Sequence, residues 1–546
     1  MSTNISKQHR EDLLNKIRQI RSYIAAAPQD ANTGNLLQYL DELTKDVKGK
    51  KYGLVFEQHR EKIDEILATH TPVLTEQKDL FIDNGGEMNF LIEGDNLAAL
   101  QLLEKTHKGR IDLIYIDPPY NRGKNDFIYD DDYVGKDDLF RHSKWSSFMK
   151  KRFEVAKTLL SKEGLIFISI DDNEIAPLKI LCDEVFDDKN FINLFVWQRN
   201  SSAKTEKGKF TVNTEYLLLY SNTDKYVLNS AFKPLSEASQ KLFKYDDNDG
   251  RGKYQTVSLQ KPKDPGPETT YDYVDNNGKI WKCPPKGWRM KCEKIKALEN
   301  DNRLVLSGKS LRVKDYWNER ENEGKRIDTL WNDIAQNTAG SSELESIMGK
   351  SNSFDNPKPV ELIMRCLEIG SDSSTVLDFF AGSGTTGHAV LKLNSKRGHR
   401  KYILCTNNEK NICRDVTYQR LKTVITGKRK DGSEYNEHYD ASLKYYKVEF
   451  VPISDKLYYE YADELLLHIR ELVELENGIN FNGNNDIAIV LTDEEMEQFV
   501  RKTNNHTKVL YRGHDVLLTA EQEDYLNTKG IKVNVIPDYY YNELNR

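Results

Sequence analysis

A short turn, Asp117-Pro118-Pro119-Tyr120, directly follows the apolar segment 111–116. Two consecutive prolines stiffen the backbone and remove two N–H donors, so carbonyl groups of the turn stay free to accept hydrogen bonds. Asp117 adds a carboxylate acceptor and Tyr120 adds a flat aromatic face. In isolation the turn could be a rigid loop, but ligands bind at the carboxyl ends of parallel strands. The turn therefore predicts a site that holds an amino group between two acceptors and stacks a planar ring.

A second turn is rich in glycine and joins an apolar segment to a predicted helix. It reads Asp378-Phe-Phe-Ala-Gly-Ser-Gly-Thr-Thr-Gly387. Glycines at such a turn let backbone N–H groups approach a ligand at the start of a helix. Alone, this could also be a tight turn or a generic nucleotide loop. Glu409 follows the next predicted strand, 25 residues after Gly384, where an acid would hold ribose hydroxyls. Each of the two turns makes the other more credible as a ligand site.

The elements that must position these turns alternate between strands and helices. Strands are predicted at 90–92, 111–116, 165–170, 375–379 and 402–405, and helices at 97–105 and 146–160. This alternation predicts a parallel sheet covered by helices, in which both turns follow strand ends.

The alternation of strands and helices is interrupted between about residues 196 and 340, and the sequence therefore predicts five regions. These are a helical region at 1–75, a first half of the α/β domain at 76–195, a mixed α+β insertion at 196–340, a second half at 341–428, and a carboxy-terminal helix with a small α/β domain at 437–546. In the last region a helix is expected over 455–476, with Ser454 as its amino-terminal cap and Gly478 just beyond its end.

Composition excludes several classes of protein. The chain is 38% hydrophobic and 30% charged with a net charge of −7, and it contains no apolar run of about 18 residues, so no transmembrane helix is expected. The amino terminus lacks the apolar stretch of a secretory signal. Six cysteines without a Cys-x-x-Cys pair argue against a zinc ribbon or a disulfide scaffold and fit a reducing cytoplasm.

One segment, 279–296, carries seven basic residues against one acid. It could contact nucleic-acid phosphates, because the local field rather than the net charge decides such binding. It could equally be a solvated face. Trp281 and Trp288 lie within it and could wedge or stack, but core packing is the favoured interpretation of each.

The paired motifs Asp117-Pro-Pro-Tyr120 and Phe380-Ala-Gly-Ser-Gly384 resemble the signature of amino-methyltransferases that act on DNA. The glycine loop comes 263 residues after Asp117, and this order is similar to the permuted β class, whose target-recognition insert lies between the two halves. The resemblance covers about residues 50–425. Gly94-Asp95-Asn96 resembles the acidic turn that contacts the adenine of the cofactor. Lys358, within Phe354-Asp-Asn-Pro-Lys-Pro359, would sit near its methionine carboxylate.

The resemblance implies a permuted, Rossmann-like methyltransferase sheet, interrupted by the insertion and extended at both ends. The expected cofactor is S-adenosylmethionine, with no metal, and the expected catalytic residues are Asp117, Pro118, Pro119 and Tyr120. The residues expected to bind the cofactor are Asp95, Lys358, Asp378, Phe380, Ala381, Gly382, Ser383, Gly384, Thr385 and Glu409. The expected reaction is methylation at N6 of an adenine flipped out of duplex DNA.

The layout, with Lys51-Tyr-Gly-Leu-Val-Phe-Glu57 upstream and an extension at the carboxyl end, most resembles modification subunits of type III restriction systems. That implies double-stranded DNA as a partner, a homodimer, a separate ATP-dependent restriction subunit, and a location in the prokaryotic cytoplasm near the nucleoid. Phosphate contacts are expected from basic residues of the insertion, namely Lys204, Lys207, Lys209, Lys282, Lys286, Arg289 and Lys291.

Three alternatives stay open. N4 of cytosine is a similar amine, although a serine in place of Asp117 would have favoured it. Methylation of a protein glutamine or of RNA uses related turns, but the long insertion and the motif order count against it. A DNA-recognition subunit for a separate nuclease is the third. The chain itself is not expected to power cleavage, because Gly349-Lys-Ser351 lacks the earlier glycine of a phosphate loop and has Leu344 in its place.

Overall fold

A computed structural model of the chain divides it into two compact units, Met1–Val227 with Ala335–Arg546 (the main unit) and Leu228–Ile334 (the second unit). The structure describes residues 5–26, 33–48, 59–123, 127–129, 132–201, 210–229, 232–233, 241–262, 266–306, 310–320, 325–370, 372–453, 464–482, 484–502 and 506–536.

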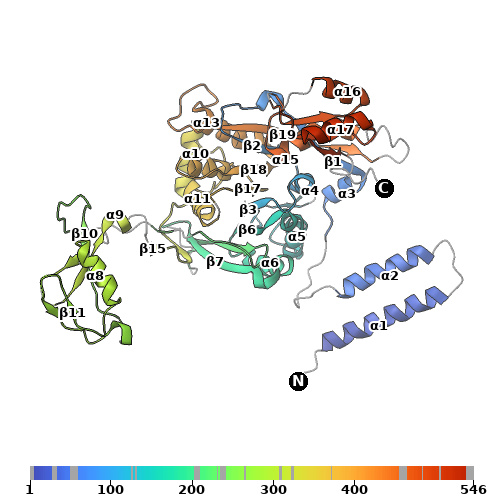
Figure 1. The fold of residues 1–546 in the computed structure, drawn as a ribbon. Helices are drawn as coiled ribbons and strands as arrows, with labels where there is room; N and C mark the ends of the chain where they lie inside the picture. The colour runs from blue at the N-terminus through green and yellow to red at the C-terminus, as the bar shows by residue number, and fades with distance from the viewer. Residues whose placement is uncertain are drawn as a thin grey trace. The chain divides into compact units, whose positions relative to one another are not determined.

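A large mixed sheet forms the centre of the main unit (Figure 1). Its strands in this unit are β1 (His70–Glu76), β2 (Glu87–Glu93), β3 (Ile111–Ile116), β6 (Leu160–Ile170), β7 (Phe191–Gln198), β8 (Thr214–Ser221), β17 (Thr375–Asp378), β18 (Lys401–Thr406) and β19 (Ala441–Pro452). They lie in the order β1-β19-β2-β18-β17-β3-β6-β8-β7. The six strands from β19 to β6 run parallel, whereas β1, β8 and β7 pair antiparallel at the two sides.

Helices cover both faces of this sheet (Figure 1). One group contains α4 (Asn96–His107), α5 (Arg141–Leu159) and α6 (Ile175–Cys182), and the other contains α10 (Asn337–Met348), α11 (Val360–Ile369), α12 (Thr385–Asn394) and α13 (Tyr418–Thr426). The strands β3, β17 and β18 are buried at nearly every position, as strands covered on both faces must be. The predicted Rossmann-like α/β sheet is confirmed.

The parallel pairing sets the position of the predicted ligand turns. β17 lies between β3 and β18, with Leu377 opposite Ile114 and Asp378 opposite Leu404. β18 in turn pairs with β2. Because parallel strands end at the same edge, the segments that follow β2, β3, β17 and β18 gather at one edge of the sheet.

The second unit has a small core of its own. It contains a three-stranded antiparallel sheet of β10 (Tyr254–Ser258), β13 (Leu304–Val305) and β14 (Arg312–Tyr316), a hairpin of β11 (Tyr273–Val274) and β12 (Ile280–Trp281), and helix α8 (Cys292–Asn300). Trp281 and Trp288 are buried in this core. Their indole N–H groups donate to Asp275 Oδ2 and to the Tyr271 carbonyl at 2.9 and 2.7 Å. The favoured interpretation of both tryptophans as core residues is confirmed.

The structure draws several region borders elsewhere than the sequence predicted. The predicted insertion, 196–340, begins inside β7 and includes β8, which pairs with β6 and β7 in the main sheet. The compact second unit is narrower, at Leu228–Ile334. The border at 75 cuts β1, and the region 437–546 includes β19, which pairs with β1 and β2. Polar segments beside these strands hid their membership of the main sheet.

The carboxy-terminal part forms a three-stranded parallel sheet of β20 (Ile487–Val490), β21 (Val509–Arg512) and β22 (Lys532–Val535), with α16 (Asp493–Lys502) and α17 (Ala520–Lys529). Helix α15 (Ile469–Asn477) ends at Gly478, which has φ +64° as predicted for a helix terminator. The predicted cap Ser454 lies outside the described residues.

The amino-terminal part is helical over α1 (Ile5–Ala26), α2 (Thr33–Lys48) and α3 (Lys62–Thr69). The motif Lys51–Glu57 lies outside the described residues. Among the described residues, no helix combines the length and apolarity that a membrane crossing requires.

The core position of Leu377 makes a stability prediction. Leu377 is fully buried in β17, which leads into the glycine loop and pairs with β3 and β18. Leu377→Ala should lower the free energy of unfolding of the main unit by about 2–5 kcal/mol, because it leaves a cavity. Urea unfolding followed by tryptophan fluorescence measures this. Leu139→Ala, at a side chain that is 92% exposed, should change stability by less than about 0.5 kcal/mol, and an equal loss in the two variants would contradict the assignment of the core.

Candidate functional site

The Asp117 turn is anchored on one side and open on the other. The Trp145 indole N–H donates to the Pro119 carbonyl at 2.7 Å, which fixes the backbone of the turn. The side chain of Asp117 is 30% exposed, and its Oδ1 atom lies 3.3 Å from Lys358 Nζ. This oxygen is itself buried, and its contact with Lys358 is an ion pair. The turn therefore presents a partly exposed carboxylate that is paired with an ammonium group.

Lys358 lies at the centre of a buried polar cluster beside that turn. Its Nζ donates to the Tyr120 hydroxyl and to Glu215 Oε2, both at 2.8 Å. The Tyr120 hydroxyl donates to the same Glu215 oxygen at 3.2 Å. Arg199 Nη1 pairs with the other oxygen of Glu215 at 2.8 Å. The cluster thus shares one lysine between two carboxylates.

Burial and charge act in opposite directions on the ionisable groups of this cluster. Burial raises the pKa of Asp117 more than the Lys358 charge lowers it. Burial alone would lower the pKa of Lys358, but the carboxylates of Asp117 and Glu215 raise it overall. For Glu215, burial is outweighed by Lys358 and Arg199, so its pKa is lowered. The site is therefore a set of buried charges that stabilise one another.

The glycine loop is fixed by its own side chains. Asp378 accepts from the Phe380 N–H at 2.9 Å and from the Thr386 hydroxyl at 2.5 Å. Gly382 and Gly384 have φ of +47° and +75°, which favour glycine. Gly384 caps the start of α12. The turn therefore holds a left-handed backbone at the amino end of a helix, where an anionic or polar ligand is stabilised.

Neighbouring residues close on the loop from two sides. A Cβ atom on Gly382 would lie 3.1 Å from the Phe354 ring, and one on Gly384 would lie 3.2 Å from Thr417. The Thr417 hydroxyl donates to the Gly382 carbonyl at 2.6 Å. The buried Ser383 and Thr385 hydroxyls contact the Arg420 guanidinium at 3.3 and 2.7 Å. The loop is thus closely packed, and a side chain at either glycine would push a neighbouring side chain aside and strain the left-handed backbone.

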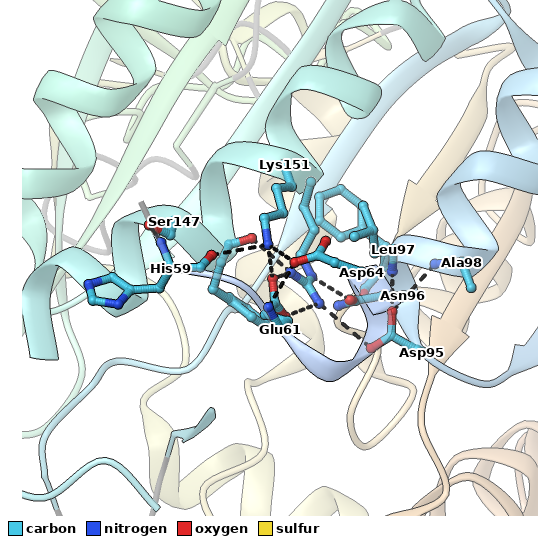
Figure 2. Close-up of polar contacts among 12 residues, drawn as sticks. His59, Glu61, Asp64, Asp95, Asn96, Leu97, Ala98, Ser147 and Lys151 are labelled. Atoms are coloured by element: carbon cyan, nitrogen blue, oxygen red, sulfur yellow. Dashed lines mark hydrogen bonds and ion pairs between the residues drawn. The ribbon is translucent and has the colours of Figure 1, made fainter. Parts of the chain in front are cut away.

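Asp95 follows β2 and caps α4, as Figure 2 shows. Its Oδ1 accepts from the backbone N–H groups of Leu97 and Ala98 at 2.8 and 3.4 Å. Asn96, next to it, donates from its amide to the Phe379 carbonyl at 3.0 Å. The Asp95 side chain is 37% exposed, and its second oxygen lies 3.6 Å from Arg152 Nη2. The turn after β2 is therefore bonded directly to the turn after β17.

A fully buried arginine, Arg152 of α5, holds this junction. It donates to Asn96 Oδ1 at 2.5 Å and lies 3.6 Å from Asp95 Oδ2. Its other nitrogens donate to both oxygens of Glu61 at 3.0 and 3.1 Å. Figure 2 shows Glu61 close to Asp64, Asp95 and Asn96. This arginine was not predicted, because a lone Arg in a basic helix carries no signal of burial.

The remaining predicted residues are placed as follows. Glu409 follows β18 at the same sheet edge, is exposed and accepts from Asn407 at 2.9 Å. Lys204, Lys207 and Lys209 lie outside the described residues. In the second unit, Lys282 and Lys291 pair with Asp272 and Glu268, and Lys286 and Arg289 donate to backbone carbonyls.

The structure thus brings Asp95, Asp117, Lys358, the glycine loop and Glu409 to one edge of one sheet. Glu215, which contacts Lys358 and the Tyr120 hydroxyl, was also not predicted. The available signal was an acid at the start of an apolar strand, Glu215-Tyr-Leu-Leu-Leu-Tyr220, where a buried carboxylate needs a partner. The arrangement offers hydrogen-bond acceptors for an amine and an aromatic ring on which a base can stack. It also offers a glycine loop that can hold a second ligand.

Several known proteins are similar in sequence to this chain. The DNA methylase family matches residues 111–418. The StyLTI Mod subunit, a type III restriction-modification enzyme of Salmonella typhimurium, is 33% identical over 67% of this chain and 59% of its own length. The EcoPI Mod subunit of Escherichia phage P1 is 30% identical over 60% of this chain and 59% of its own. The type II methyltransferase M.KpnI of Klebsiella pneumoniae is 33% identical over 66% of this chain and 90% of its own. The chain therefore spans about three fifths of the two Mod subunits.

Asp378 makes a pH prediction, because burial raises its pKa from 3.8 to about 7. The folded state favours the protonated acid, so its contribution to stability is complete below pH 4 and is lost as the pH rises to about 7. In Asp378→Asn the side chain cannot ionise, so the free energy of unfolding should fall less between pH 5 and pH 8 than in the unaltered chain. Urea unfolding at both pH values, without added ligand, measures this. An identical fall in the two proteins would contradict the prediction.

Proposed function

The chain belongs to the DNA methylase family, and from this premise we propose that it is a site-specific DNA methyltransferase. It transfers a methyl group from S-adenosylmethionine to N6 of an adenine flipped out of duplex DNA. The observation that carries the proposal is the pairing of β3 with β17. This pairing sets the Asp117 turn beside the glycine loop, so that an amine and a methyl donor can face each other.

The residues at the sheet edge fit S-adenosylmethionine. The loop Phe380–Thr385 would hold it at the start of α12, Asp95 would contact its adenine and Glu409 its ribose. Lys358 is proposed to lie near its methionine carboxylate, although its ammonium also contacts Tyr120 and Glu215. When bound, this group supplies a sulfonium methyl that is already electrophilic, so the protein need only orient the nucleophile.

The Asp117 turn is proposed to orient the target amine. An aromatic amine delocalises its lone pair into the ring and is a poor nucleophile. Hydrogen bonds from N6–H to the Asp117 carboxylate and the Pro118 carbonyl would favour a tetrahedral nitrogen with its lone pair directed at the methyl. The partial exposure of the Asp117 side chain, 30%, supports this role.

Stacking of the flipped base is assigned to Tyr120. The Arg122 guanidinium lies over the Tyr120 ring, 4.8 Å from its centroid. Extrusion from the duplex brings the base to the enzyme. If the base stacks on the ring face that Arg122 covers, it displaces the Arg122 guanidinium.

Adenine is favoured over cytosine because the turn begins with an aspartate rather than a serine. Similarity to two Mod subunits supports a modification and recognition role within a type III restriction-modification system, with a homodimer and a separate restriction subunit as proposed partners. A prokaryotic cytoplasmic location follows from such a role. Phosphate contacts by Lys282, Lys286, Arg289 and Lys291 are part of the same proposal.

The test uses the purified chain, tritiated S-adenosylmethionine and genomic DNA that carries no methylated bases. We expect label in DNA, and sequencing of the product should find N6-methyladenine in one short sequence context. Asp117→Ala should lower the rate of transfer by at least about 10³-fold, because the amine loses its acceptor, while S-adenosylmethionine binding by calorimetry stays within about twofold. N4-methylcytosine in the product would show that the target base is cytosine and not adenine. Normal methylation by Asp117→Ala would show that Asp117 has no role in the reaction.

Gly382 makes a prediction for cofactor binding. In Gly382→Ala the left-handed backbone at φ +47° is strained and the new methyl group meets Phe354. The loop should relax away from its binding conformation, which should weaken S-adenosylmethionine binding by about tenfold or more. Gly432→Ala is the matched control, because Gly432 also has positive φ but has open space around it. Equal affinities of the two variants would show that the loop does not hold the cofactor.

A further inference from the structure

We propose that Glu215 is a positioning residue for methyl transfer, because it takes the shorter contact with Lys358 and so limits how strongly this ammonium group engages the Asp117 carboxylate that accepts the target amine. The inference rests on the proposed function and adds a residue to its site. Glu215 lies on β8, which is separated from β3 by β6 alone. Its side chain is 3% exposed.

Glu215 and Asp117 compete for the same ammonium group. Lys358 Nζ lies 2.8 Å from Glu215 Oε2, with hydrogen-bond geometry, and 3.3 Å from Asp117 Oδ1, without it. A carboxylate oxygen that accepts a strong bond from an ammonium is a weaker acceptor for a second N–H group. By taking the shorter contact, Glu215 preserves the acceptor strength of Asp117.

The same oxygen of Glu215 orients the proposed stacking ring. It accepts from the Tyr120 hydroxyl at 3.2 Å, and Lys358 donates to that hydroxyl at 2.8 Å. One carboxylate therefore fixes both neighbours of Asp117, the lysine and the tyrosine.

The second oxygen of Glu215 is held from the other side. Arg199 Nη1 lies 2.8 Å from it and Arg122 Nη2 lies 3.4 Å away, while Arg122 also pairs with Asp171 at 2.7 Å. Three cations, Lys358, Arg199 and Arg122, thus balance the carboxylates of Asp117, Asp171 and Glu215. If the charge at 215 is removed, Asp117 becomes the nearest carboxylate for Lys358.

Arg199 is itself held by backbone hydrogen bonds. Its N–H donates to the Asn213 carbonyl and its carbonyl accepts from the Asn337 N–H, both at 3.0 Å. Asn213 directly precedes β8 and Asn337 begins α10. Glu215 is therefore paired with a cation whose backbone is fixed from two sides.

The test is Glu215→Gln, which keeps the shape of the side chain and removes its charge. With enzyme in excess over unmethylated genomic DNA and tritiated S-adenosylmethionine, we expect the single-turnover rate of methyl transfer to fall by about 10- to 100-fold, as a loss of about 1.4–2.7 kcal/mol of transition-state stabilisation requires. Saturating S-adenosylmethionine keeps any change in cofactor affinity through Lys358 out of the measured rate.

The pH profile separates positioning from a general structural role. Asp117 must be ionised to accept the amine, and the groups that face it are Lys358, Glu215, Tyr120, Tyr115 and Asp378. Loss of the negative charge at 215 lowers the pKa of Asp117, so the acid limb of the rate profile should move to lower pH. Glu215→Asp retains the charge but retracts the carboxylate, so its rate should fall while its acid limb stays in place.

Glu474→Gln is the matched control. Glu474 is fully buried, and its Oε2 accepts from Lys444 Nζ at 2.6 Å and from the Tyr446 hydroxyl at 3.1 Å. It thus has the same kinds of partner as Glu215 but lies on α15. Its substitution should cost stability without moving the acid limb.

The outcomes separate the two proposals. An active unaltered chain with an unchanged rate and acid limb in Glu215→Gln overturns the role of Glu215 alone. The same holds if Glu474→Gln moves the acid limb equally, or if Glu215→Asp keeps the full rate. An unaltered chain that transfers no methyl group to DNA overturns the proposed function as well.

Discussion

The parallel pairing of β17 between β3 and β18 is the constraint on which the site depends. The pairing aligns strand ends that are more than 250 residues apart in the chain, and it leaves their following turns side by side. Direct bonds then join the turns. Asn96 donates to the Phe379 carbonyl, and Lys358 contacts both Tyr120 and Asp117. The site is therefore built by the sheet rather than by a local motif.

Burial of charge is the cost of this arrangement. Ions removed from water are stabilised only if partners of opposite charge are close. Here Lys358 is shared by two carboxylates, and Arg152 is bonded to Glu61 and to Asn96. Such clusters hold side chains in fixed positions before a ligand arrives. This is what a reaction that relies on orientation requires.

Much of the fold could be predicted from sequence, because hydrophobic alternation and glycine turns are local signals. The strands β3, β6 and β18 and the helix end at Gly478 were foreseen on that basis. The borders of the main sheet were not, since β19 pairs with β2, a strand distant in sequence, and the polar segment 199–213 separates β8 from β7. For the same reason Glu215 and Arg152 were missed: a single charged residue in a strand or helix does not reveal its partner. The residues of the glycine loop and the Asp117 turn carry a pattern, and the residues that support them do not.

The order of the strands also has a consequence for how the chain is made. β2 is translated early, but its two neighbours are β18 and β19, which begin at Lys401 and Ala441. During synthesis, more than 300 further residues must be added after the apolar segment Phe90–Ile92 before either partner strand exists. Long-range pairing of this kind is slow, and until it is complete the edges of the unpaired strands remain exposed. The pairing of β2 in the main sheet can therefore form only after Lys401–Thr406 has been synthesised.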